Sequence, residues 1–143
     1  MTADEQYALP PAHSRFVRHF THAIYSDPVD EFTPFGTDEG ADILAMALDG
    51  QPVLDESSTV RDVLAEEIDD VEEFIAEIPD DAPDLDGIVI GAGFTLLRLT
   101  GQVDDTGREW LVAALERSKA FYRGNDRGTF QQMLTDLASF GFS

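Results

Sequence analysis

The sequence predicts an all-α protein, a single domain (1–143) of six or seven helices packed around a buried central helix at residues 87–100. In each long segment the apolar residues recur at intervals of three and four, which is the helical period. Segment 87–100 is apolar on almost every face, as expected of a helix at the centre of a bundle. The chain has 143 residues, including ten Phe and no Cys, so one hydrophobic core can form without disulfide bonds.

The N-terminal third predicts two helices separated by a loop. A helix over 11–25 places one apolar face toward the core, made of Phe16, Val17, Phe20 and Ile24. Its polar face carries Arg15, Arg18, His19 and His22. Residues 26–36 form a loop because prolines and a glycine interrupt any regular period. Thr37 then caps a helix over 38–49, which Gly50 ends.

The next helical pattern extends from Val60 to Ile78, after a Ser57-Ser58-Thr59 cluster that can cap a helix and before Pro79. Glu67 is the exception to its period, because a straight helix would place this carboxylate inside the apolar stripe. Either the helix breaks near 66–69, or a cation such as an arginine of the C-terminal half holds Glu67. We favour a break or bend.

The central helix follows an acidic, proline-rich linker over 79–86. We expect Asp86 to cap it, because Asp is a common N-cap residue, and Gly101 to end it. Its longest apolar stretch, Ile88 to Leu97, is about half of what a bilayer span requires.

Two helices complete the predicted bundle. Thr106 and Glu109 have the spacing of a capping box for a helix over 107–123. Gly124-Asn125 predicts a tight connection, so the last helix, roughly 127–140, should fold back antiparallel to the helix before it.

The net charge of −20 lies entirely in the middle of the chain. Residues 1–25 carry two acids and two bases, residues 87–143 carry six of each, and residues 26–86 carry 21 acids against one base, Arg61. This charge favours a non-enzymatic interaction module that engages a basic protein, as an immunity-type inhibitor or accessory protein does. The predicted partner-binding residues are Asp62, Glu66, Asp69, Glu73, Glu77, Asp80, Asp81 and Asp84.

The same charge argues against two classes of partner. Nucleic acid and acidic membrane surfaces are both bound through Lys and Arg, which this chain has in low number. The N-terminal residues lack a basic stretch followed by an apolar run, so we expect a cytoplasmic protein. An alternative without a partner stays open: the chain could be a housekeeping protein whose acidity serves only solubility or salt adaptation. Such adaptation also produces a composition rich in Asp and poor in Lys, and this chain has 18 Asp, 11 Glu and one Lys.

No sequence motif predicts catalysis or a cofactor. Residues Ile88 to Gly93 look like the strand and turn of a dinucleotide-binding fold, but the position of its third glycine holds Leu96. The alternative is that Gly91 and Gly93 let a neighbouring helix approach a buried one. There is no Cys, and no serine lies in a Gly-x-Ser-x-Gly turn, so a nucleophilic enzyme is not indicated.

A second alternative is a small metal-dependent enzyme or metal-binding protein. Its ligands would be His19 and His22, three residues apart, together with Asp38 and Asp42, one turn apart. Because His19 and His22 share their face with two arginines, we expect a solvated surface without a bound metal.

The string from Phe35 to Leu44 predicts a buried aromatic side chain, a turn at Gly36, an N-cap at Thr37 and the start of a helix. It resembles the short signature of a bacterial family of unknown function, in which an aromatic, Gly or Asp, Asn-Asp, a small residue and Asp precede an apolar helix. The run of small and apolar residues in 87–100, ended by Gly101, is similar to that family's layout. The chain departs from it at Thr37, where the family usually has Asn, and lacks its upstream Trp-Gly. The resemblance implies a small helical bacterial protein, with no activity attached.

Overall fold

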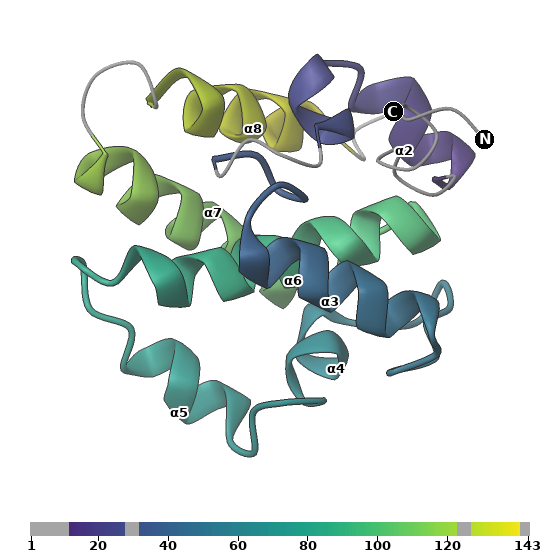
Figure 1. Ribbon diagram of the computed structural model, residues 1–143, viewed down its shortest axis with the longest axis horizontal. Helices are drawn as coiled ribbons and strands as arrows, with labels where there is room; N and C mark the ends of the chain where they lie inside the picture. Colours follow the sequence, from purple (N-terminus) through teal and green to yellow (C-terminus); the bar gives the residue numbers. More distant parts are fainter. Residues whose placement is uncertain (1–11, 28–31, 123–126, 141–143) are drawn as a thin grey trace.

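The computed structural model describes residues 12–27, 32–122 and 127–140, and these ranges form helices and loops without a strand. The helices are α2 (Ser14–His19), the 3-10 helix η1 (Ala23–Ser26), α3 (Asp38–Leu48), α4 (Val60–Leu64), α5 (Val71–Ala76), α6 (Pro83–Thr100), α7 (Asp105–Phe121) and α8 (Arg127–Ser139). The all-α prediction is therefore confirmed, with seven α-helices in the described part of the chain (Figure 1).

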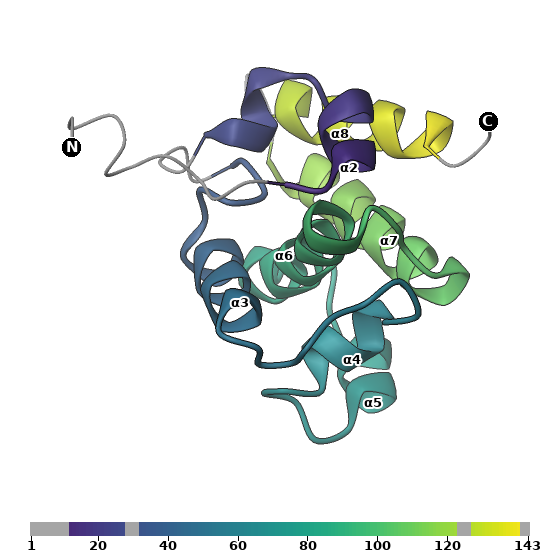
Figure 2. The same cartoon turned by 90° about the vertical axis from the view of Figure 1, so that its right-hand side faces the viewer.

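Helix α6 runs through the middle of the molecule, with α3 and α7 beside it, α2 and α8 above it and α4 and α5 below it (Figure 2). Every residue from Val89 to Arg98 is buried. The helix begins earlier than the predicted residue 87, at Pro83, because the fixed φ of proline suits the first helical position. The prediction that Asp86 caps this helix is wrong, because Asp86 lies within it. Gly101 ends it as predicted, with a φ of +71° that other residues rarely adopt.

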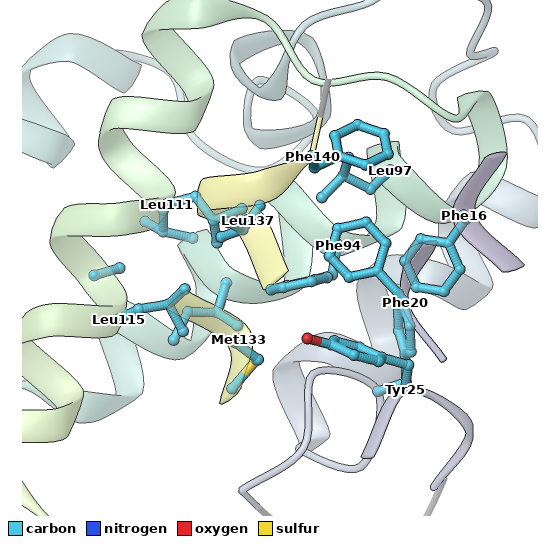
Figure 3. Packing of buried hydrophobic residues seen from close by; sticks show 14 of the residues in the cluster. Phe16, Phe20, Tyr25, Phe94, Leu97, Leu111, Leu115, Met133, Leu137 and Phe140 are labelled. Carbon is cyan, nitrogen blue, oxygen red and sulfur yellow. The ribbon is translucent and has the colours of Figure 1, made fainter. Parts of the chain in front are cut away.

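The main core is built around aromatic rings. The ring centroid of Phe94 lies 5.7 Å from that of Phe20 and 5.6 Å from that of Tyr25, and Phe16 stacks on Phe20 at 4.9 Å. Figure 3 shows these rings beside apolar side chains of α7 and α8. A smaller cluster lies where α4 and α5 meet α6, and consists of Val60, Val63, Leu64, Val71, Ala92 and Leu96.

The predicted N-terminal helix over 11–25 is wrong in its length. Helix α2 ends at His19, and the chain re-forms as η1 after His22, whose Nδ1 accepts a hydrogen bond from the Ile24 backbone N–H at 3.2 Å. The break has a packing reason, because it turns both Phe20 and Tyr25 into the main core. Val17, predicted to be apolar and inward, is 56% exposed.

Helix α3 begins and ends nearly as predicted. The Thr37 hydroxyl accepts a hydrogen bond from the Gly40 N–H at 2.9 Å, and Gly50 follows the helix with a φ of +80°. Helix α3 lies close against α6, since a Cβ added to Gly91 would be 2.8 Å from the Gly40 Cα. A Cβ added to Gly93 would similarly be 2.8 Å from Leu111. The predicted role of these α6 glycines as points of close helix approach is confirmed, and the dinucleotide-binding strand is excluded because this segment is helical.

Helices α7 and α8 lie side by side and run in opposite directions (Figure 1). The predicted Thr106–Glu109 capping box is wrong, because α7 begins at Asp105 and its N-cap is Asp104. One oxygen of the Asp104 carboxylate accepts from the Gly107 N–H at 2.9 Å, and the other accepts from the Val60 N–H at 2.8 Å. A single side chain thus caps α7 and anchors the start of α4. The predicted Gly124-Asn125 connection lies outside the described residues.

Candidate functional site

The predicted partner-binding residues follow the chain from α4 through α5 to the start of α6. All eight are exposed, and we call them the acidic face: Asp62, Glu66, Asp69, Glu73, Glu77, Asp80, Asp81 and Asp84. Helices α4 and α5 lie on the opposite side of α6 from α2 and α8 in both views (Figures 1 and 2). The structure therefore places most of these carboxylates on one side of the molecule.

Helix α4 is short and held at its N-terminus by a capping box. The Thr59 hydroxyl accepts from the Asp62 N–H at 3.1 Å, and the Asp62 carboxylate accepts from the Thr59 N–H at 2.9 Å. Arg61, the one base in residues 26–86, forms an ion pair with Glu72 of α5, with 2.5 Å between its Nε and the carboxylate Oε1. Its hydrogen bond lowers the pKa of the Glu72 carboxyl. Because both side chains are more than half exposed, this pair adds little to stability.

The favoured break in the Val60–Ile78 pattern is confirmed. Helix α4 ends at Leu64 and α5 begins at Val71, with the Asp70 carboxylate accepting from the Glu73 N–H at 3.0 Å as its N-cap. Glu67 lies in the intervening turn with its side chain exposed, so the arginine partner considered as the alternative is absent in the described residues. The break keeps a carboxylate out of the apolar stripe, which would otherwise bury an unpaired charge.

A pocket of about 410 Å³ opens between the N-termini of α3 and α6. It was not predicted, because its walls come from segments far apart in the sequence. Its carboxylates are Asp38, Glu39 and Asp84, and its aromatic side chains are Phe32, Tyr122 and Phe130. The remaining lining residues are Thr33, Gly36, Thr37, Pro83, Gly87, Ile90 and Ser118.

An ion pair joins α6 and α7, and each of its two residues is adjacent in sequence to a residue that lines this pocket. Asp86 is 1% exposed, and its Oδ1 accepts a hydrogen bond from Nε of Arg117 at 2.9 Å and forms an ion pair with Nη2, also at 2.9 Å. Burial raises the pKa of the Asp86 carboxyl above its ordinary value, and Arg117 opposes that rise. Arg117 thereby compensates the buried charge of Asp86, the residue that was predicted to be the N-cap of α6.

His19 belongs to a hydrogen-bond cluster that ties α2 to α8. Its Nε2 is 2.7 Å from the Asp136 carbonyl oxygen and 3.0 Å from the Ser139 hydroxyl. Since a carbonyl oxygen only accepts hydrogen bonds, Nε2 carries the proton and cannot act as a base toward Ser139. The Tyr25 hydroxyl donates to the Asp136 carboxylate at 2.6 Å, and burial together with this bond raises the pKa of Tyr25. These hydrogen bonds connect α2 and η1 to α8, and His19 and Ser139 do not form a nucleophile–base pair.

The four residues of the metal alternative are not assembled into a site. His19 is half-buried against α8, His22 caps η1 at the surface, and Asp38 and Asp42 lie on α3. Within the described ranges, no group of three or more His, Cys, Asp or Glu side chains is arranged to hold a metal ion. The expected surface position holds for His22, whereas His19 is partly covered.

Comparisons with protein-family models, with curated proteins and with solved structures find no match to this chain. The resemblance of the Phe35–Leu44 string to a bacterial family therefore stays a prediction. In the part of the chain that the structure describes, no helix has both the length and the apolar character needed to cross a membrane.

Proposed function

We propose that the protein is a non-enzymatic acidic helical module that binds a basic protein through its acidic face. The observation that carries the proposal is that most carboxylates on that face have no partner within the described part of the protein. Among the residues that the structure describes, seven of the eight form no hydrogen bond or ion pair with a side chain or backbone group, and the eighth, Asp62, serves as half of a capping box. Their charge is therefore available to an external cation.

The distribution of cations in the described residues supports the same function. Arg61, the only base between 26 and 86, is engaged by Glu72, and Arg117 is engaged by Asp86. Arg15 and Arg18 lie on α2, across α6 from the acidic face (Figure 2). A surface with one sign of charge and no internal compensation raises the association rate of an oppositely charged protein. A cytoplasmic immunity-type or accessory role in a bacterial cell fits such a surface.

Salt or solubility adaptation is the competing explanation, because an uncompensated acidic surface also keeps a protein dispersed. The two explanations differ in what salt does. A binding face loses its partner as the Debye length falls from about 30 Å at 0.01 M to about 8 Å at 0.15 M salt. An adapted surface has no partner, and its melting temperature rises with salt as repulsion between carboxylates is screened.

Charge reversal tests the proposal. The variant Glu66→Lys/Asp69→Lys/Glu73→Lys/Glu77→Lys changes four carboxylates that make no hydrogen bond with a described residue, and leaves the Asp62 cap intact. A matched control reverses four exposed acids of α3, its C-terminal end and α7: Asp42→Lys/Asp49→Lys/Glu109→Lys/Glu116→Lys. Both variants change the net charge equally.

We expect a basic protein captured by the wild type at low salt to be lost with the first variant and retained with the control. Circular dichroism of both variants checks that the helices are intact. Equal retention by both variants, or equal loss from both, would contradict a specific acidic face. The absence of any captured protein, with melting that depends on salt, would instead support adaptation.

A further inference from the structure

We infer that the pocket between the N-termini of α3 and α6 binds an organic cation, an ammonium or guanidinium group on a short apolar stem. The described lining of the pocket includes no residue of α4 or α5, and Asp84 of α6 is the one residue that it shares with the acidic face. Its volume of about 410 Å³ lies within the range of small-molecule sites. The inference does not rest on the proposed function, because it depends on the lining of this cavity alone.

The aromatic walls form a corner suited to an apolar stem and a cation. The rings of Tyr122 and Phe130 are stacked, with centroids 5.7 Å apart and planes 12° apart. The Phe32 ring stands at 78° to Tyr122, with their centroids 5.0 Å apart. Phe130 is 5% exposed, whereas Phe32 and Tyr122 are half-buried. Aromatic faces attract ammonium and guanidinium groups through the ring quadrupole.

The polar part of the lining carries negative charge. Asp38, Glu39 and Asp84 line the pocket, and none of them forms an ion pair or a side-chain hydrogen bond with another described residue. The N-termini of α3 and α6 also face this region, and each contributes a partial positive charge of about +0.5. In the described lining, three full negative charges outweigh the two helix ends, so the pocket favours a cation over the anions that helix N-termini alone attract.

Two neighbouring features keep the pocket open and its charge uncompensated. Gly87 lies at the wall without a side chain, and a Cβ added there would be 3.7 Å from the Glu39 carboxylate oxygen. Glu39 of α3 therefore lies over α6 at this glycine. Arg117, adjacent in sequence to the lining residue Ser118, directs its guanidinium to Asp86 instead of the pocket carboxylates.

An organic cation of this kind can be a free small molecule or the side chain of an Arg or Lys in another protein. Two probes distinguish these sources at about 0.15 M salt, where diffuse attraction is screened. The first is butylguanidinium, with neutral butyramide and anionic butyrate as controls that lack the cation and whose apolar stem is one carbon shorter. The second is an acetylated, amidated Gly-Arg-Gly peptide, with Gly-Gln-Gly as its control.

We expect butylguanidinium to shift the NMR signals of the Tyr122 and Phe130 rings in a saturable titration, and butyramide and butyrate to leave them unchanged. Tighter binding of the Arg peptide assigns the pocket to a protein side chain, and binding of butylguanidinium alone assigns it to a free cation. Saturation by neither cation up to about 10 mM, or equal binding of butyramide, would overturn the inference, because a charged and preformed site should exceed that affinity.

Matched variants separate the pocket from the general negative charge of the molecule. Glu39→Gln/Asp84→Asn should weaken butylguanidinium binding about 10-fold or more, since each loses a direct Coulombic partner. The control Asp49→Asn/Glu109→Gln removes the same charge from exposed sites outside the pocket and should change the affinity less than about 2-fold. Gly87→Leu should block the cavity without changing any charge. Equal weakening by the two double variants would show that the cation only samples the ion atmosphere, whatever the outcome for the acidic face.

Discussion

Replacing Phe94 by Ala should lower the free energy of unfolding by about 3–5 kcal/mol. Phe94 is 0% exposed and packs against the rings of Phe20 and Tyr25 in the main core. Withdrawing a Phe side chain from water contributes about 1.5–3 kcal/mol. The void left after partial collapse adds roughly 24 cal/mol per Å³, or about 1.5 kcal/mol for about 60 Å³. A domain whose total stability is about 5–15 kcal/mol would lose a large share of it.

Urea unfolding followed by far-UV circular dichroism measures this loss, and Phe121→Ala is the matched control. Phe121 lies at the end of α7 and is 45% exposed, so removal of the same atoms should cost less than about 1 kcal/mol. An unchanged slope against urea would show that the change is one of stability. A loss below about 1 kcal/mol for Phe94→Ala, or equal losses for both variants, would refute the central position assigned to α6.

Three further predictions use the same unfolding assay. Asp104→Ala removes the hydrogen bonds that cap α7 and anchor α4, and should lower the free energy of unfolding by about 1–3 kcal/mol. A change near zero would contradict a stabilising role of Asp104 at the starts of both helices. Gly91→Ala should cost about 1–3 kcal/mol, because its Cβ would press on the α3 backbone, whereas Gly87→Ala should be neutral or slightly stabilising. Arg117→Met strands the Asp86 carboxylate and should cost about 2–4 kcal/mol at neutral pH. Because burial raises the pKa of Asp86, the folded variant binds a proton more tightly than the unfolded chain, so its deficit should shrink as pH falls toward the ordinary Asp range; a deficit independent of pH would contradict this.

The local parts of the fold were predictable from the sequence because short-range physics decides them. Thr37 and Gly50 bound α3 through a hydroxyl cap and a positive φ, and Gly101 ends α6 in the same way. The break after Leu64 follows from Glu67, since a helix that buries an unpaired carboxylate is less stable than two short helices. Each of these signals involves residues within a few positions of one another.

The parts that the sequence did not predict depend on contacts between distant residues. Asp86 looked like an N-cap, but Arg117, 31 positions later, makes its burial tolerable and lets α6 begin at Pro83. Likewise α2 stops early because Phe20 must reach rings of the main core. The pocket combines α3, α6 and α7 with α8, so no local pattern could have revealed it.

The segment from α4 to Glu77, which carries most of the acidic face, is attached to the rest of the protein by caps and a small apolar cluster, and not by an ion pair to another part of the described chain. Helix α4 is fixed by the Asp104 carboxylate and by the burial of Val60, Val63 and Leu64, whereas α5 contributes only Val71 to the same cluster as a fully buried side chain. Carboxylates exposed on short helices are close to bulk water, where like charges repel weakly. The fold can therefore carry these carboxylates without destabilising the aromatic core, and changes of charge on the acidic face should affect association before they affect folding.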